Sequence, residues 1–232
     1  HTAYRRQRQM CIRDRLHAMG FAAMTPVQAE TLPPLIDGKD VIAQASTGSG
    51  KTAAYALACL QRLQPKSFHV QSLVLCPTRE LAEQVAQSVR DLAKNIANTK
   101  ILTLCGGVPL WPQIGSLQHS AHIIVGTPGR VLKHLQNGTL HLHGLDVMVF
   151  DEADRMLDMG FADEIDAISS FLPQPRQTLL FSATFPEGVR DLAQDLREGA
   201  VQVDVTRTEE APRISQRWLC LLYTSPSPRD RG

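Results

Sequence analysis

Two adjacent acidic residues, Asp151 and Glu152, directly follow the apolar run VMVF at residues 147–150. A continuous apolar run of this length is typical of a buried strand in a parallel sheet. At the end of such a strand, one carboxylate can hold a hydrated magnesium ion while the other orients a water molecule, and burying both without a cation would be costly. Taken alone, however, the tetrapeptide DEAD at residues 151–154 more often indicates a solvated turn or a helix N-cap.

A second chemically informative segment, ASTGSGKT, lies at residues 45–52 between a predicted strand and a predicted helix. The backbone N–H groups of such a glycine-rich turn can close around phosphate oxygens at a helix N-terminus, where the helix dipole also favours anions. Lys51 would contact the β- and γ-phosphates, and the Thr52 hydroxyl would ligate magnesium. Alanine stands where the first glycine is usual, and the pattern predicts a nucleoside triphosphate site formed by Ala45, Ser46, Thr47, Gly48, Ser49, Gly50, Lys51 and Thr52.

This phosphate-binding loop gives the acidic pair a chemical role. Asp151 would hold magnesium together with Thr52, partly through water, and Glu152 would orient the water that attacks the γ-phosphate. The predicted catalytic residues are therefore Glu152, Asp151 and Lys51. Asp154 is expected to make structural contacts instead of touching the nucleotide, and its candidate partners are Ser182 and Thr184.

Apolar runs alternate with segments of helical period along most of the chain. The predicted strands lie at residues 40–44, 72–76, 100–105, 122–125, 146–150, 177–181 and 201–205. Repeated strand–helix units with short connections predict an α/β domain, with a mostly parallel sheet and helices on both faces. One helix is expected to start after Thr25 and to be interrupted at Pro33 and Pro34. Ligands of such folds bind beyond the carboxyl ends of the strands, where the motifs above are predicted to lie.

The composition fits one large α/β domain or two small ones, since the chain has 232 residues, of which 43% are hydrophobic and 20% are charged. The formal net charge is +1, but residues 1–15 carry +4 and residues 223–232 carry +1, so the body between them carries −4. A mildly acidic body gives no electrostatic argument for nucleic-acid binding, which must rest on motifs. The five cysteines contain no CxxC pair and disfavour a zinc site.

Features of membrane or secreted proteins are not found in the sequence. No apolar run approaches the roughly 18–20 residues that span a bilayer. The basic amino-terminal end lacks the apolar segment of a secretory signal. The expected compartment is the cytoplasm.

Both ends differ from the body of the chain. Residues 1–15 and 221–232 show neither a strand nor a helix period, and the second segment is rich in proline, serine and arginine. We interpret both as non-native or disordered ends, which resemble translated sequencing-adapter sequence. The alternative is a basic tail that binds RNA.

Six motifs in a fixed order identify a family. DEAD and ASTGSGKT occur together with PTRELA at residues 77–82, Gly106–Gly107, TPGR at residues 127–130 and SAT at residues 182–184. This set resembles the DEAD-box RNA helicases, and the segment around Phe21, Thr25 and Gln28 is similar to the Q motif of that family. The resemblance covers about residues 16–218. It implies a RecA-like P-loop NTPase domain at residues 16–206, with ATP and Mg²⁺ as cofactors and RNA as the partner of a monomer.

The resemblance also implies roles for individual residues. Gln28 would read the adenine edge, because an amide offers a donor and an acceptor side by side, and Phe21 and Thr25 would lie nearby. Asp154, Ser182 and Thr184 would couple the nucleotide state to RNA. The residues that would grip the sugar-phosphate backbone without reading bases are Pro77, Thr78, Arg79, Gly107, Thr127, Pro128, Gly129 and Arg130. Taken singly, each of these is more often a helix cap or a turn.

The phrases TKILTLCGG and RQTLLFSAT resemble a bacterial branch of the family that acts on ribosomal RNA. The whole enzyme would then couple ATP hydrolysis to local unwinding of RNA duplexes in ribosomal RNA metabolism.

Two departures from the family pattern qualify these expectations. The aromatic residue that stacks on adenine is replaced by Cys11, so the adenine pocket is expected to be incomplete. Residues 207–220 resemble a linker and the start of a second RecA-like domain, which would supply arginines for the γ-phosphate. The chain is therefore expected to be nearly inactive alone, and the alternative function is a nucleotide- and RNA-binding module without turnover. A P-loop ATPase unrelated to RNA is a more distant alternative.

Overall fold

The computed structural model describes residues 10, 12, 14–20, 22–194 and 199–206. The expectations for Cys11, Phe21, residues 207–220 and residues 221–232 lie outside these residues, as does most of the basic amino-terminal end. None of the described helices is both long enough and apolar enough to cross a membrane.

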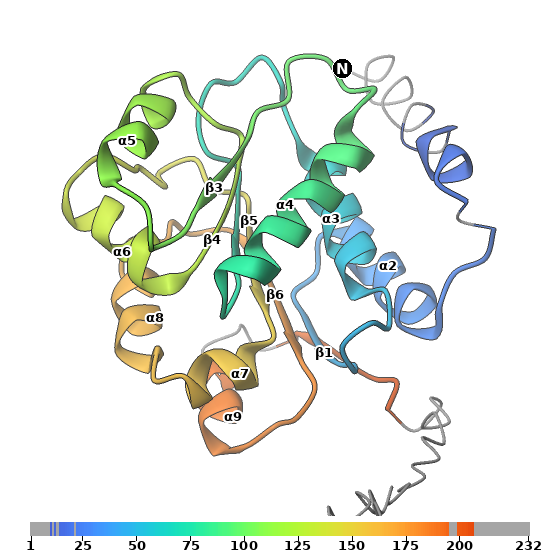
Figure 1. Cartoon of the computed structure of the whole chain (residues 1–232). Helices are drawn as coiled ribbons and strands as arrows, with labels where there is room; N and C mark the ends of the chain where they lie inside the picture. The colour runs from blue at the N-terminus through green and yellow to red at the C-terminus, as the bar shows by residue number, and fades with distance from the viewer. Residues whose placement is uncertain (1–9, 11, 13, 21, 195–198, 207–232) are drawn as a thin grey trace, which may run out of the picture.

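In the described part of the chain, seven parallel strands form one sheet in the order β3-β4-β2-β5-β6-β1-β7 (Figure 1). The strands are β1 (Val41–Gln44), β2 (Ser72–Leu75), β3 (Ile101–Leu104), β4 (Ile123–Gly126), β5 (Val147–Asp151), β6 (Gln177–Ser182) and β7 (Val201–Asp204). The helices are α2 (Pro26–Asp37), α3 (Lys51–Arg62), α4 (Arg79–Ala93), α5 (Leu110–Gln118), α6 (Pro128–Gln136), α7 (Ala153–Asp158), α8 (Ala162–Ser169) and α9 (Glu187–Gln194).

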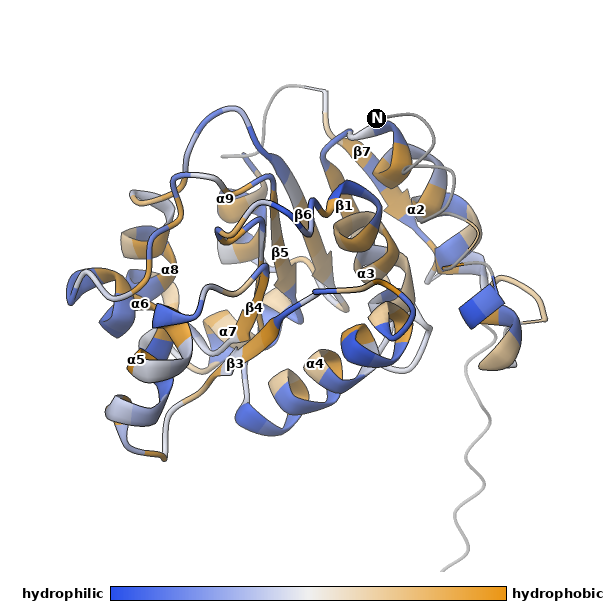
Figure 2. Ribbon diagram, turned by 90° about the horizontal axis from the view of Figure 1, so that it is seen from above, coloured by the Kyte–Doolittle hydropathy of each residue, from blue (hydrophilic) through white to orange (hydrophobic). Residues whose placement is uncertain are grey.

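The helices cover both faces of the sheet, so two hydrophobic cores form. Helices α2, α3 and α4 pack on one face, and α6, α7, α8 and α9 pack on the other (Figure 1). The side chains of β5 alternate between the two cores: Val147 and Val149 enter the first, and Met148 and Phe150 enter the second. This arrangement explains the continuous apolar run in the sequence, since both faces of the strand are buried. Several of the helices are banded in apolar and polar residues, as helices that pack one face on a core must be (Figure 2).

The expected fold class, a mostly parallel α/β sheet with helices on both faces, is thus confirmed. The expected interruption of the first long helix is wrong, because α2 continues through Pro33 and Pro34 to Asp37. The two prolines lack the N–H groups that would bond to the carbonyls of Ala29 and Glu30. Both of those residues are exposed, so water can satisfy their carbonyl groups.

The strand order divides the carboxyl edge of the sheet into two halves. The neighbouring strands β5, β6 and β1 are followed by the DEAD, SAT and ASTGSGKT motifs. The neighbouring strands β3, β4 and β2 are followed by Gly106–Gly107, TPGR and PTRELA. Motifs from distant parts of the sequence therefore form two clusters side by side on one edge.

Candidate functional site

The segment ASTGSGKT forms the turn between β1 and α3. Gly48 and Gly50 have φ angles of +85° and +92°, and Gly50 is the N-cap of α3, which begins at Lys51. The turn is anchored where it begins, because the Ala45 N–H donates to the Ser182 carbonyl of β6 at 3.0 Å. It is also braced internally by the Ser49 hydroxyl, which donates to the Ser46 carbonyl at 2.8 Å. The left-handed glycines let the backbone turn sharply between β1 and α3, where the sequence predicts a phosphate-binding loop.

Gly50 offers a test of how closely this turn is packed. A Cβ atom at this position would lie only 2.7 Å from Nε2 of Gln28, which is a steric clash. This clash adds to the roughly 1–2 kcal/mol that a left-handed conformation costs a non-glycine residue. We expect Gly50→Ala to lower stability in urea unfolding by more than this backbone cost and to weaken binding of Mg-ADP. Gly160→Ala is the matched control, because its φ is +83° but nothing lies within 4 Å of the added Cβ. Equal losses of stability in the two variants would contradict the close packing of Gly50 on Gln28.

Lys51 and Asp151 meet below the phosphate-binding turn. Lys51 Nζ lies 3.3 Å from Asp151 Oδ1, and the side chains are 5% and 0% exposed. The Tyr55 hydroxyl donates to the other carboxylate oxygen of Asp151 at 2.8 Å and also lies beside Thr52. Burial raises the pKa of Asp151 above its usual value, against the opposing influence of Lys51 and Tyr55. Burial and the Asp151 charge raise the pKa of Tyr55, so that the phenol keeps its proton and donates.

This buried pair is under-bonded. Within the described residues, Nζ of Lys51 and Oδ1 of Asp151 have no hydrogen-bond partner, although they form an ion pair. Buried polar atoms without partners are rare in folded proteins. A triphosphate would satisfy the ammonium, and hydrated magnesium would satisfy the carboxylate together with the nearby Thr52 hydroxyl. These residues therefore fit the predicted ligands, Mg²⁺ and ATP.

Glu152 joins the DEAD segment to the phosphate-binding turn. It is 6% exposed and adopts φ 54° and ψ 54° as the N-cap of α7, a left-handed conformation that is uncommon for a residue other than glycine. Its Oε1 accepts from the Thr47 hydroxyl at 3.1 Å, and its Oε2 accepts from Arg155 at 3.3 Å. The strained backbone thus points the carboxylate towards the turn that would hold the phosphates.

Asp154 contacts both residues that the sequence suggested as its partners. Its Oδ2 accepts from the Thr184 N–H at 2.9 Å and from the Thr184 hydroxyl at 2.8 Å. Its own N–H donates to the Ser182 hydroxyl oxygen at 3.1 Å. Burial alone would raise the pKa of Asp154, but the hydrogen bonds from Thr184, Arg155 and Ser182 outweigh it and lower the pKa below its usual value. Asp154 is therefore charged at neutral pH and ties the DEAD segment to the loop after β6.

Gln28 ties α2 to the phosphate-binding turn. Its Oε1 accepts from the Thr25 N–H at 3.1 Å, and its Nε2 donates to the Gly50 carbonyl at 3.0 Å. One N–H and one lone pair of the amide remain for a ligand. A cavity of about 330 Å³ lies beside Gln28 and is lined mainly by apolar residues, among them Leu16, Met24 and Leu57. An apolar slot with one oriented amide suits a planar base.

The other half of the edge presents the residues predicted to contact RNA. Thr78 caps α4, where its hydroxyl oxygen accepts from the Leu81 N–H at 3.2 Å. Thr127 is the N-cap of α6, and Pro128 and Gly129 form the first turn of that helix. Gly107 has a φ of +78°, and a Cβ atom there would lie 3.6 Å from the Arg79 guanidinium. The three motifs therefore present two helix N-termini and a bare glycine backbone next to one another.

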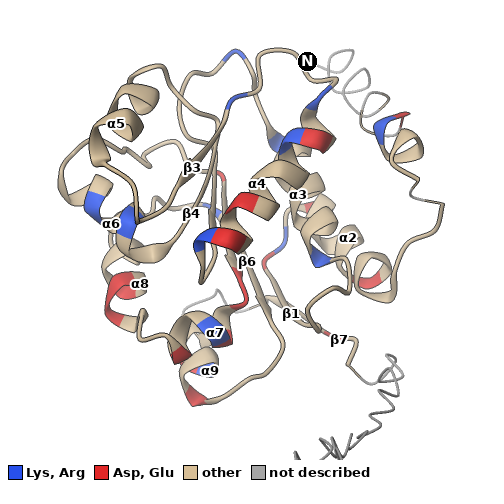
Figure 3. Ribbon diagram, in the orientation of Figure 1, with Lys and Arg blue, Asp and Glu red and all other residues tan. Residues whose placement is uncertain are grey.

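Charge is not concentrated at this edge. Both blue and red residues occur along α4, and the only Lys or Arg residues of α6 are Arg130 and Lys133 (Figure 3). Arg79 itself is paired with Glu83 at 2.8 Å. Any contact with a polyanion here must rely on a few oriented groups instead of a broad basic surface.

Several residues in these clusters were missed by the sequence analysis. Tyr55 and Arg155 contact the acidic pair. Gln113 contacts both Arg130 and His134. A tyrosine one turn after Lys51 was a possible signal for the first. Nothing local distinguishes Gln113 or His134 from ordinary helix residues, since their partners are far away in the sequence.

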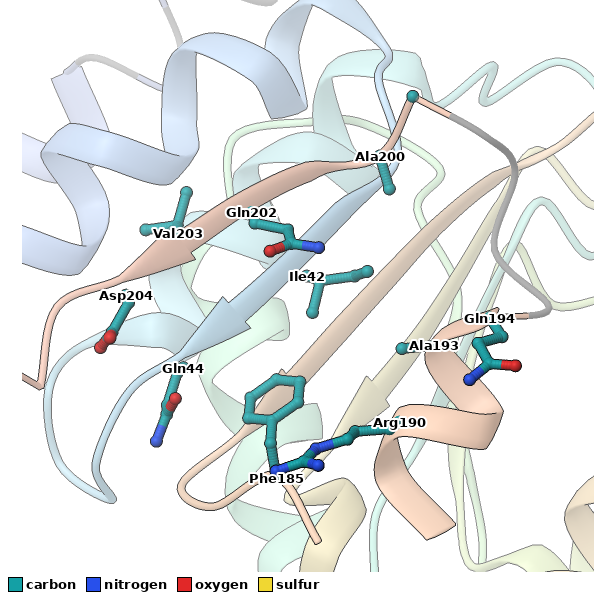
Figure 4. A pocket seen from close by; sticks show the side chains of 11 residues that line it. Ile42, Gln44, Phe185, Arg190, Ala193, Gln194, Ala200, Gln202, Val203 and Asp204 are labelled. Atoms are coloured by element: carbon teal, nitrogen blue, oxygen red, sulfur yellow. The ribbon is translucent and has the colours of Figure 1, made fainter. Parts of the chain in front are cut away.

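A larger cavity, of about 790 Å³, lies on the sheet between β1, β7 and α9 (Figure 4). Ile42, Phe185 and Arg190 are among the residues that line it. None of the site residues predicted from the sequence is among its described lining residues, although Gln44 and Phe185 directly adjoin Ala45 and Thr184 in the sequence.

Comparison with known proteins is consistent with this geometry. Residues 25–192 match the family model described as DEAD/DEAH box helicase. The chain is 54% identical over 203 residues to the ATP-dependent RNA helicase DbpA of Escherichia coli, a match covering 88% of the chain and 44% of that protein. It is 43% identical over 205 residues to the DEAD-box ATP-dependent RNA helicase CshA of Geobacillus kaustophilus, covering 88% and 44%. The chain thus spans less than half the length of these relatives.

Solved structures give the same picture of the fold. A DEAD box protein from the hyperthermophile Methanococcus jannaschii superimposes with a TM-score of 0.78 at 38% identity, covering 82% of this chain and 52% of that one. Dbp5 of Saccharomyces cerevisiae, solved with Nup159, Gle1, IP6 and ADP, superimposes with a TM-score of 0.76 at 33% identity, covering 84% and 51%.

Proposed function

Because the chain belongs to the DEAD-box RNA helicase family, we propose that residues 16–206 are the ATP-binding half of an ATP-dependent RNA helicase. The whole enzyme couples binding and hydrolysis of Mg-ATP to local unwinding of RNA duplexes, with ribosomal RNA as the substrate, as a monomer in the cytoplasm. Residues 207–220, which lie outside the described residues, lead into its second RecA-like domain. The observation that carries the proposal is the contact between the ASTGSGKT segment and the DEAD segment. Lys51 forms an ion pair with Asp151, and the Thr47 hydroxyl donates a hydrogen bond to Glu152.

In this proposal each residue of the nucleotide cluster has one task. Lys51 and the N–H groups of the ASTGSGKT turn bind the β- and γ-phosphates, and Thr52 and Asp151 hold magnesium. The metal, when bound, neutralises the charge that develops on the phosphate oxygens. Glu152 accepts a hydrogen bond from the attacking water and takes up its proton. The oriented amide of Gln28 and the adjacent apolar cavity select adenine.

The hydrogen bonds between Asp154, Ser182 and Thr184 couple the state of the bound nucleotide to RNA binding. These three residues connect the helix that follows Glu152 to the loop after β6. A change at the γ-phosphate that moves Glu152 therefore also shifts hydrogen bonds at the loop after β6. RNA binds to the other half of the edge through its phosphates, at Pro77, Thr78, Arg79, Gly107, Thr127, Pro128, Gly129 and Arg130.

A melting experiment with nucleotides tests the proposed base and phosphate site. A ligand at 100 times its Kd stabilises a fold by about 2.7 kcal/mol, which corresponds to a Tm shift of about 5–11 °C for a domain of this size. We expect Mg-ADP to produce such a shift at saturation and Mg-GDP to produce none. Equal shifts with the two nucleotides would contradict the role of Gln28 in recognising adenine. No shift with Mg-ADP would contradict the proposed function.

A further inference from the structure

Arg130 is held in one orientation by two hydrogen bonds. Its Nη1 donates to Oε1 of Gln113 at 2.9 Å, and its Nη2 donates to the carbonyl of Val108 at 2.8 Å. A guanidinium has five N–H donors, and these contacts use two of them. Among the described residues the other three have no hydrogen-bond partner and can meet an incoming anion, and the half-buried side chain is already fixed.

Gln113 is the centre of this arrangement. Its side chain is buried, although it lies near the start of α5, just after the loop that contains Gly106–Gly107. Its Oε1 accepts from Arg130 and lies 3.0 Å from Nε2 of His134, and its Nε2 donates to the Cys105 carbonyl at 3.1 Å. The amide therefore joins the end of β3, helix α5 and helix α6 through a single group.

His134 completes the network as a neutral ring. Burial, and then the neighbouring Arg130 charge, lower the pKa of His134 below its usual value. Oε1 of Gln113 can only accept, so the single proton of the neutral imidazole is assigned to Nε2. Nδ1 then faces the Thr139 hydroxyl at 2.9 Å, whose one proton is shared between Nδ1 and the His134 carbonyl at 3.1 Å. No second cation competes with Arg130 inside this network.

The network links two of the three motifs that the proposed function assigns to RNA. Val108 directly follows Gly106–Gly107, and its carbonyl is held by Arg130 of TPGR. Cys105 directly precedes the same glycines and is held by Gln113. The glycine loop is therefore anchored on both sides to α5 and α6.

We propose that Gln113 and His134 are positioning residues for RNA binding, which hold Arg130 and the Gly106–Gly107 loop in one pre-formed site for the phosphates of a single strand. This inference rests on the proposed function. Pre-organisation lowers the entropic cost of fixing a flexible side chain on binding, which is about 0.5–1.5 kcal/mol for each side chain. Gln113 and His134 act through Arg130 and the glycine loop and do not themselves touch the RNA.

The test uses the full chain and a labelled single-stranded decauridylate, with fluorescence anisotropy at low salt. We expect Gln113→Met to raise the Kd by about 2- to 12-fold, the factor that corresponds to immobilising one side chain. We expect Arg130→Ala to raise it at least as much. The Tm shift with Mg-ADP is expected to stay unchanged, because the network lies on the other half of the edge. Gln118→Met is the matched control, since Gln118 lies on the same helix but is exposed.

The double variant Gln113→Met/Arg130→Ala separates positioning from simple loss of stability. Because Arg130 is one of the two groups that Gln113 holds, the loss of affinity in the double variant is expected to be smaller than the product of the two single losses. Multiplicative losses, or an unchanged Kd for Gln113→Met beside a raised one for Arg130→Ala, would overturn the inference and leave the proposed function standing. If the unaltered chain does not bind the decauridylate, or if neither Arg79→Ala nor Arg130→Ala weakens binding, the proposed RNA site and the inference both fall.

Gln113→Asn is the second variant, in case the methionine variant does not fold. Its amide is one methylene shorter, so it cannot keep the contacts to both Arg130 and Cys105. The shorter amide remains polar and can form hydrogen bonds with water, so it leaves fewer buried groups without partners than methionine does. The same rise in Kd is expected. A Gln113→Asn chain that folds and binds as tightly as the unaltered chain would overturn the inference.

Discussion

Replacing Lys51 with methionine is expected to destabilise the folded chain by about 3–5 kcal/mol at neutral pH, the usual cost of removing one partner of a buried ion pair. Asp151 would remain fully buried, and among the described side chains the Tyr55 hydroxyl would be left to stabilise its charge. Lys51 exerts the largest of the influences that lower the pKa of Asp151, so its loss raises that pKa further above the value in the unfolded chain. Urea unfolding of the two chains measures the difference.

The pH dependence of this effect has a definite sign. An acid whose pKa is higher in the folded chain binds its proton more tightly there, so its protonated form favours folding at low pH. The destabilisation by Lys51→Met is therefore expected to shrink as the pH falls from 7 and Asp151 becomes neutral. A constant difference across this range would contradict the buried charge as its cause.

A second substitution distinguishes stability from ligand binding. Adding Asp151→Asn to Lys51→Met replaces the unpaired carboxylate with a neutral amide of the same shape, so we expect most of the lost stability to return. Mg-ADP should still produce no Tm shift, because both the phosphate-binding ammonium and a metal ligand are missing. A full nucleotide-induced shift in the double variant would exclude Lys51 from the phosphate site.

Glu152→Gln is expected to lower kcat for ATP hydrolysis by about 10²- to 10⁴-fold, the contribution of a positioned general base. The measurement requires a complete helicase, for example a chimaera in which residues 1–206 are followed by the part of E. coli DbpA that corresponds to residue 207 and beyond. Glutamine can keep the hydrogen bond from Thr47 and has the same shape, so the KM for ATP should change little. The loss is confined to proton transfer.

Glu187→Gln is the control for this experiment, because it makes the same change in an exposed residue at the start of α9. It should leave both kinetic constants of the chimaera unchanged. Hydrolysis by the Glu152→Gln chimaera at the unaltered rate would exclude Glu152 as the base. A parallel rise in KM would instead assign it a role in binding ATP.

The sequence predicted most of the fold, because most strands lie in apolar runs and most of these runs are followed by a helical period. Its clear error was the helix around Pro33 and Pro34. The local rule that proline interrupts a helix failed because the carbonyls left without partners face solvent. The helix is held instead by the burial of residues such as Val27 and Leu35.

The chemical identity of the site was also accessible from the sequence, since the residue types needed to bind phosphate and magnesium lie in short motifs. Parallel strands place their carboxyl ends at one edge, so motifs far apart in the sequence were expected to lie together. The sequence alone could not tell which motifs would be neighbours. Which motifs are neighbours depends on the strand order. It places DEAD, SAT and ASTGSGKT, the proposed nucleotide cluster, beside the proposed RNA cluster of PTRELA, Gly106–Gly107 and TPGR.

The sequence alone thus predicted the ligands and the chemistry, because these predictions follow from side-chain types at fixed local spacing. Only the tertiary structure decided how the groups are aimed. The left-handed backbone of Glu152, the under-bonded pair of Lys51 and Asp151, and the network of Gln113, His134 and Arg130 all depend on contacts between separate loops and helices. Such contacts leave no local pattern, since each partner looks ordinary until the sheet and its helices bring it within hydrogen-bond distance of the other.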